Sequence, residues 1–150
     1  MWVCVCIVAC THEPVLPAEE VPDSSYGLLY QKILKPGCAL SGCHATEGDN
    51  SYVQHGLAFT GAAATYSRLI NGSVKDAQAL TAGLKQVVPG DTLNSFLFQK
   101  INFDKATHAY GLSMPIGADP LTPFQVLFVQ QWILAGAPET GHVADKTLLP

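Results

Sequence analysis

Two cysteines and a histidine lie in one short run whose residue types can hold a metal cofactor: Cys38-Ala39-Leu40-Ser41-Gly42-Cys43-His44. A c-type haem is held by thioether bonds to two cysteines, and the histidine after the second cysteine ligates the iron, with the usual spacing C-x-x-C-H. Here two extra residues separate the cysteines, but Cys43 and His44 remain adjacent. The residues between them are mostly small, so the loop can bulge. The run therefore predicts covalent attachment of one haem at Cys38 and Cys43.

In this arrangement His44 ligates the iron through one ring nitrogen. The other ring nitrogen of a metal-bound histidine usually donates a hydrogen bond, and that bond fixes the orientation of the ring. We expect a backbone carbonyl as the acceptor, with the region around Pro89 as the candidate.

Two other interpretations of the same cysteines stay open. Cys38 and Cys43 could form a disulfide that closes a small loop, as in a haemless binding or structural lipoprotein. They could also contribute to a zinc site, but zinc needs four nearby ligands, and adjacent Cys43 and His44 fit a tetrahedron poorly. A disulfide gives no role to His44.

The N-terminal region predicts export. Residues 1–10 form an almost continuous apolar stretch, typical of a signal-peptide core, and its last four residues resemble a bacterial lipobox that ends at Cys10. Cys10 is therefore the predicted lipidation site. Residues 11–23 contain several prolines and glutamates and are predicted to be a flexible tether. We expect a folded domain over residues 24–140 and a C-terminal tail over residues 141–150.

About four helices must position the cysteine run. The first begins at Ser24 or Ser25 and ends at Pro36-Gly37, directly before Cys38. The second spans residues 62–70, with Thr60 as its cap. The last begins at the cap Thr122, has Pro123 at its first position, and ends at Gly136.

The third helix is predicted after a cap at Asp91 or Thr92, and Leu93, Phe96 and Ile101 are among its apolar positions. Strand patterns are scarce. The predicted class is all-α with long loops. Loops of this length fit a domain in which they wrap a haem, which is a large, flat and apolar group.

At this point the chain resembles the small class I-like cytochrome c domains, in particular a group from bacterial lipoproteins. Four blocks carry the resemblance: residues 38–44, Val88-Pro89-Gly90-Asp91, Met114-Pro115-Ile116-Gly117 and residues 132–138. It implies a cytochrome c-like fold in which Met114 is the distal iron ligand. It also implies that the helix with Gly27 crosses the last helix near Phe128 and Trp132, where the small Gly27 would allow close approach. His55 and His108 are the alternative distal ligands.

Composition and charge argue against several classes of function. The net charge of −4 argues against nucleic acid as a partner and against electrostatic docking to an anionic membrane. We expect a periplasmic-side electron carrier that meets redox partner proteins, with membrane attachment only through the lipid. No catalytic triad or phosphate loop is visible, so we do not expect an enzyme. The alternative is a haem-based sensor or enzyme, which would require an iron without Met114.

Overall fold

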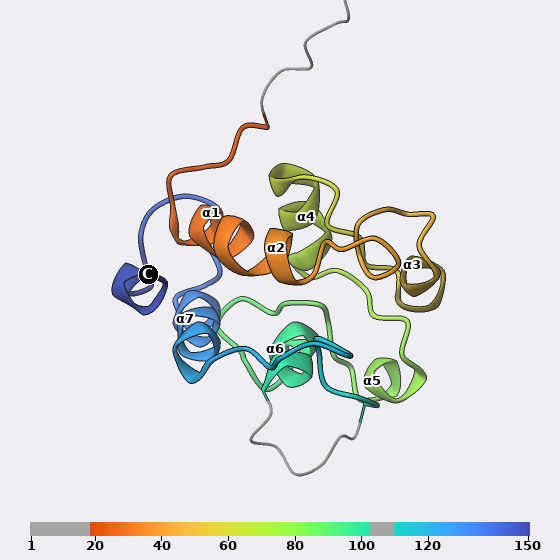
Figure 1. Cartoon of the computed structure of the whole chain (residues 1–150). Coiled ribbons are helices and arrows are strands. Elements are labelled where there is room, and N and C mark those ends of the chain that lie inside the picture. The colour runs from red at the N-terminus through yellow and green to blue at the C-terminus, as the bar shows by residue number, and fades with distance from the viewer. Residues whose placement is uncertain (1–18, 103–109) are drawn as a thin grey trace, which may run out of the picture.

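The computed structural model describes residues 19–102 and 110–150. In this part of the chain the regular structure is helical, and β-pairing is limited to isolated bridges. The predicted all-α class is confirmed (Figure 1). The helices are α1 (Ser25–Leu29), the π-helical η1 (Tyr30–Leu34), α2 (Lys35–Gly37), α3 (Asn50–His55), α4 (Ala62–Leu69), α5 (Ala77–Thr81), α6 (Phe96–Ile101), α7 (Pro123–Leu134) and the 3-10 helix η2 (Lys146–Leu148).

The first helical run, formed by α1, η1 and α2 without a break, follows the prediction. Ser24 is the N-cap, and its hydroxyl oxygen accepts a hydrogen bond from the Gly27 amide at 3.0 Å. The run ends at Gly37, and the amide of Cys38 still donates to the carbonyl of Leu34 at 2.9 Å. The apolar face therefore points into the core while the end of the run delivers Cys38.

The last helix, α7, also follows the prediction at both ends. Thr122 and Gln125 form a capping box, Pro123 is in the first turn, and the chain leaves the helix through Gly136 at φ +94°. Phe128 and Trp132 are fully buried. Phe124, in the first turn of the helix, remains 64% exposed.

α1 and α7 pack against each other, as expected, with the rings of Tyr26 and Trp132 5.9 Å apart. The role expected for Gly27 is wrong. A Cβ at this position would lie 1.7 Å from the carbonyl oxygen of Pro22, so Gly27 is needed for the close approach of the segment before α1 and not for α7.

Two other helix starts differ from the prediction. α6 begins only at Phe96, with Ser95 as its N-cap, because the Asp91 carboxylate accepts the amides of Leu93 and Asn94 and forms a separate turn. Leu93 is accordingly 69% exposed. α4 is capped by Gly61 and not by Thr60.

Short helices that the sequence analysis did not predict lie in the loops, namely α3, α5 and η2. The segment after residue 140 packs on the helical body. The Ser25 amide donates to the carbonyl of Gly141 at 2.9 Å, its hydroxyl accepts the amides of Val143 and Ala144, and Leu149 is buried. No helix among the described residues is both long and apolar enough to span a bilayer.

The core lies between the helices of the first half of the chain and those of the second half. Buried residues of α1, η1, α4, α6 and α7 form one cluster, and a smaller cluster lies around α5 and Phe96. In Figure 1 the loop that follows α2 lies above, and the segment of residues 110–121 runs below it, near α6. These two loops carry the predicted ligands.

Candidate functional site

Cys38 and Cys43 lie at the two ends of a tight turn and are not bonded to each other. Cys38 is half-buried against the main core, and its Sγ is 4.0 Å from the carbonyl oxygen of Ile33, whereas Cys43 is exposed. Burial, with a contribution from Cys43, raises the pKa of the Cys38 thiol to about 11. This thiol therefore stays protonated at neutral pH, which disfavours a role as nucleophile.

The two residues added to the usual spacing form a closed turn. The Cys43 amide donates to the carbonyl of Leu40 at 2.9 Å, and Gly42 takes a left-handed φ of +79°. The Asp49 carboxylate accepts the amides of Thr46 at 2.6 Å and Gly42 at 3.1 Å. These hydrogen bonds, that of Thr46 first, lower the pKa of Asp49. The predicted bulge is thus an ordered turn held by one carboxylate.

His44 has one ring nitrogen engaged and the other available. Its Nδ1 lies 2.8 Å from the carbonyl oxygen of Leu57. Because a carbonyl can only accept, Nδ1 must carry the proton, and Nε2 then has the lone pair that can bind a metal. The expected backbone acceptor is present, but it belongs to Leu57 and not to the region around Pro89.

The segment after α3 fixes His44 from a second side. The Phe59 amide donates to the carbonyl of His44 at 2.7 Å, and the two rings lie 5.4 Å apart. Leu57 and Phe59 are both buried in the main core cluster. The position of His44 is therefore tied directly to the core.

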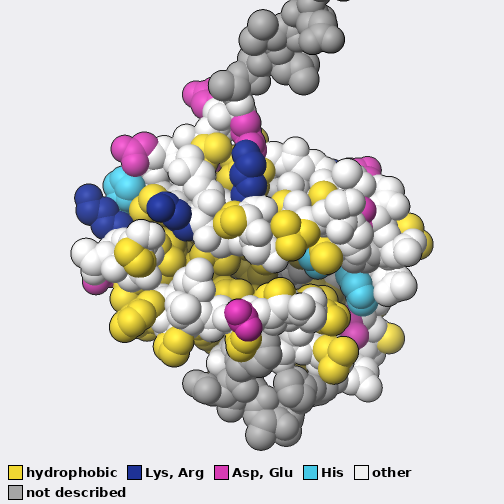
Figure 2. All heavy atoms as spheres, viewed as in Figure 1, with side chains coloured by type: hydrophobic (Ala, Val, Ile, Leu, Met, Phe, Trp, Pro, Cys, Tyr) yellow, Lys and Arg dark blue, Asp and Glu magenta, His cyan; other side chains and the backbone are white. Residues whose placement is uncertain are grey.

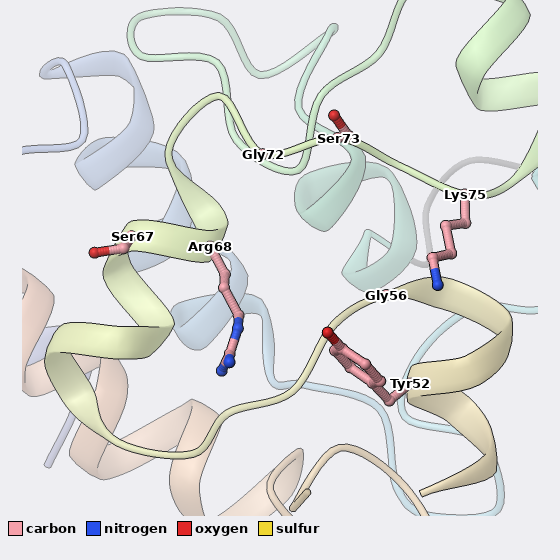
Figure 3. Close-up of a pocket in the computed structure, with 7 residues that line it drawn as sticks. All are labelled: Tyr52, Gly56, Ser67, Arg68, Gly72, Ser73 and Lys75. Atoms are coloured by element: carbon pink, nitrogen blue, oxygen red, sulfur yellow. The ribbon is translucent and has the colours of Figure 1, made fainter. Parts of the chain in front are cut away.

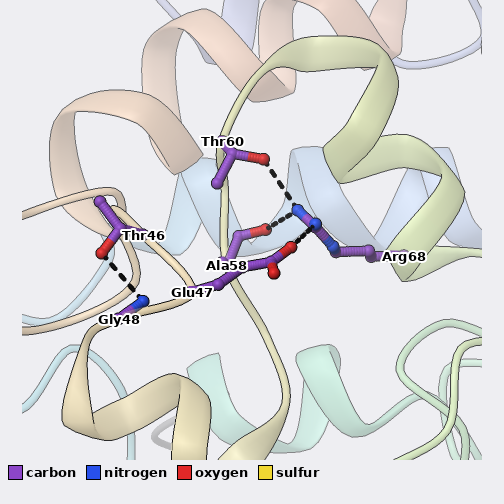
Figure 4. A network of polar contacts seen from close by, with 6 residues as sticks. All are labelled: Thr46, Glu47, Gly48, Ala58, Thr60 and Arg68. Atoms are coloured by element: carbon purple, nitrogen blue, oxygen red, sulfur yellow. Dashed lines mark hydrogen bonds and ion pairs between the residues drawn. The ribbon is translucent and has the colours of Figure 1, made fainter.

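Arg68, on α4, connects the two halves of the His44 loop (Figure 4). Its guanidinium donates to the carbonyl of Ala58 at 3.2 Å and to the hydroxyl of Thr60 at 2.8 Å, and it forms an ion pair with Glu47. Thr60 was predicted only as a helix cap. This contact could not be predicted from the sequence, because Arg68 is an ordinary polar position on an amphipathic helix.

Met114 is half-buried in a segment without helix or strand. Its amide donates to the carbonyl of Lys100, on α6, at 2.6 Å. The ammonium of Lys100 donates to the carbonyl of Tyr110 at 3.0 Å and also to that of Leu112. Burial lowers the pKa of Lys100. The sequence analysis did not single out this lysine.

Two glycines and two apolar residues flank Met114. Gly111 and Gly117 take left-handed φ angles of +81° and +74°, which bend the chain on either side of Met114. The side chains of Leu112 and Ile116 are 66% and 58% exposed.

His55, on α3, is close enough to His44 and to Lys100 for both to affect its pKa. Burial lowers the pKa of His55, the nearby Lys100 and His44 lower it further, and the carboxylate of Asp76 raises it. His55 therefore lies within electrostatic reach of both the His44 loop and α6. His108, the other alternative ligand, and Cys10 lie outside the described residues. His142 is remote, in an ion pair with Asp23 at 3.2 Å.

The surface between the two loops is hollowed. Figure 2, in the same view as Figure 1, shows hydrophobic side chains lining an elongated depression between the α1–α2 side and the α6–α7 side, with histidine at one end. An apolar depression of this kind suits a flat apolar group better than a small polar ligand.

A second hollow, of about 320 Å³, lies beside α3 and α4 (Figure 3). Its two cations already have partners. Arg68 binds Glu47 and the carbonyl of Ala58, and the ammonium of Lys75 lies 3.5 Å from the carbonyl of Val53 and 5.5 Å from the Tyr52 ring centre. Its full lining is Tyr52, Gly56, Ser67, Arg68, Gly72, Ser73 and Lys75.

Comparison with protein-family models, curated proteins and solved structures finds no match to this chain. What the site can bind therefore has to be inferred from its own residues. Residues 19–102 and 110–150 contain no group of three His, Cys, Asp or Glu side chains that could hold a metal ion by itself. The unbonded thiols of Cys38 and Cys43 and the available Nε2 of His44 fit a covalently attached haem, which brings four iron ligands of its own.

Proposed function

We propose that this chain is an exported c-type cytochrome with one covalent haem, and that it carries electrons between redox partner proteins. The observation that carries the proposal is the state of His44. It directly follows Cys43, its Nδ1 is held by the Leu57 carbonyl, and its Nε2 is left to bind iron. A disulfide-only protein would have no use for this arrangement.

The thiols would hold the cofactor by thioether bonds, so that haem is not lost after export. The ordered turn at Gly42 sets the path of the chain from Cys38, at the end of α2, to Cys43 and His44. When bound, the haem iron supplies one-electron chemistry.

Met114 is proposed as the distal ligand. A thioether favours Fe(II), so Met ligation raises the reduction potential relative to two histidines. With His44 and Met114 both on the iron, no coordination position is left for oxygen or a substrate. A carrier role follows from this ligand pair, with no catalysis by the chain itself.

Export and membrane attachment through a lipid on Cys10 complete the proposal. They are supported by the apolar residues 1–10 and the lipobox-like run before Cys10. The net charge of −4 supports attachment through the lipid alone.

The test is expression of the full chain in a bacterial host that attaches haem, followed by intact mass and absorption spectra. The wild type and a Ser41→Ala control, changed within the same turn, should each gain the mass of one haem. Cys38→Ser and Cys43→Ser should keep at most one thioether, with a shifted absorption band. The intact mass of the wild type also shows whether a lipid is attached to Cys10.

An exported wild-type chain with its haem-free mass and a Cys38–Cys43 disulfide would refute the haem proposal. Recovery of the chain in the cytoplasm, with Met1 intact, would refute export and lipidation.

A further inference from the structure

Lys100 contacts the segment that leads to Met114 through both its backbone and its side chain. Its backbone carbonyl accepts the Met114 amide at 2.6 Å. Its ammonium donates to the carbonyls of Tyr110, at 3.0 Å, and Leu112. One residue of α6 therefore binds three backbone groups within residues 110–114.

We propose that Lys100 is a positioning residue that holds Met114 at the haem site, an inference that rests on the proposed function. Its backbone fixes the amide of Met114 itself, and its side chain fixes the approach of the chain to Met114. Loss of the side chain would remove two of these three hydrogen bonds and leave the one between the Met114 amide and the Lys100 carbonyl.

The environment of Lys100 makes these bonds stronger than those of a surface lysine. Its side chain is half-buried, and its ammonium lies 5.8 Å from the ring centre of Phe96. Hydrogen bonds from a charged donor are stronger than neutral ones, and partial removal of water strengthens them further. Exposed lysines such as Lys32 lack this setting.

The segment has no regular secondary structure to hold it. Residues 110–121 form no helix or strand, and Gly111 and Gly117 at positive φ add no stiffness of their own. Tyr110 supports the beginning of the segment, with its ring 5.9 Å from that of Phe96. That contact lies four residues before Met114, whereas the Lys100 carbonyl accepts the amide of Met114 itself.

The experiment compares the haem-loaded full chain with three variants. Lys100→Met removes the donors but keeps the aliphatic length, Lys100→Arg keeps the charge and the donors, and Lys32→Met controls for the loss of one lysine from a helix. The readouts are hydrogen–deuterium exchange of residues 110–114, the near-infrared sulfur-to-iron band and the reduction potential.

In Lys100→Met we expect exchange of residues 110–114 to rise about tenfold or more, as for loss of hydrogen bonds to a charged group. The near-infrared band should weaken and the potential should fall. Lys100→Arg should restore most of all three, and Lys32→Met should match the wild type. Unchanged exchange in Lys100→Met would overturn the proposal, and so would faster exchange with an unchanged band and potential.

The proposed function can fail separately. A wild type without haem refutes it, and the exchange of residues 110–114 then still decides whether Lys100 holds the segment. A haem-loaded wild type without the sulfur-to-iron band shows that Met114 is not a ligand, and this overturns the positioning role as well.

Discussion

The loop with His44 and the loop with Met114 are built differently, although both are irregular segments that hold a proposed ligand. The His44 loop is tied at several points by separate residues: Leu57 and Phe59 from the core, Asp49 from within the loop, and Arg68 from α4. In the Met114 loop, a single residue of α6, Lys100, binds three backbone groups. Because irregular backbone needs partners for its polar groups, the number of independent partners measures how firmly a loop is held.

This difference suits the proposed electron carrier, in which the His44 ligand would stay fixed and the Met114 ligand would be displaced more easily. In the proposed cytochrome, the His44 side must stay in place because the neighbouring cysteines would be covalently attached to the haem. The Met114 side can yield more easily, since loss of one lysine contact affects several backbone groups together. The two sides should therefore respond very differently to single substitutions.

Removal of Met114 has the largest expected effect on the redox properties. In the haem-loaded chain, Met114→Ala should open a coordination position, lower the potential and abolish the near-infrared sulfur-to-iron band. Cyanide or carbon monoxide should then bind quickly. Met114→His should keep the iron six-coordinate and still lower the potential, because a ligand that favours Fe(II) has gone.

Leu112→Ala is the matched control, since it changes an exposed residue of the same segment. It should leave band and potential near their wild-type values. If Met114→Ala also leaves both unchanged, Met114 is not a ligand, and His55 and His108 become the candidates.

Substitution of Arg68 should have a smaller effect, because the His44 loop has other partners. Arg68→Met removes the hydrogen bonds to Ala58 and Thr60 and should lower the free energy of unfolding by about 1–2 kcal/mol. Glu47→Gln, which removes only a solvent-exposed ion pair, should cost less than about 1 kcal/mol. Denaturant unfolding of both variants and of the double mutant separates the two contributions.

In these variants the His44 ligation should persist, with unchanged mass and a near-wild-type visible spectrum. Loss of haem in Arg68→Met would contradict the comparison, since it would show that the His44 loop also depends on a single residue.

Acidification should produce the smallest effect, and only in the turn between the cysteines. The pKa of Asp49 is lowered in the folded chain, mainly by the Thr46 amide, so its contribution is present above the ordinary aspartate pKa of about 3.9 and is lost as pH falls through the lower folded value. In NMR spectra, the amide shifts of Gly42 and Thr46 should titrate with a midpoint below about 3.9.

Asp49→Asn should remove this titration, while Asp145→Asn, changed at a distant exposed aspartate, should leave it intact. A midpoint at or above the ordinary aspartate value would show that the carboxylate does not hold the turn.

Local interactions explain why the sequence by itself determined much of the helical frame. The caps Ser24 and Thr122, the stop at Gly37 and the apolar spacing from Tyr26 onward act within one or two turns, so their residue types can be recognised directly. The adjacency of Cys43 and His44 is likewise a covalent fact. The prediction was less accurate at Asp91, where a turn competed with the helix cap.

Only the tertiary structure decided what holds the proposed ligands. Leu57 supports His44 through its carbonyl oxygen, and Lys100 supports residues 110–114 through their carbonyls. Every residue has a carbonyl, so the acceptor's residue type carries no signal in the sequence. Arg68 and Lys100 are ordinary polar helix residues until folding brings a distant loop within reach. Which backbone groups lie near them is fixed by the packing of α4 and α6 in the core, and that depends on the whole chain.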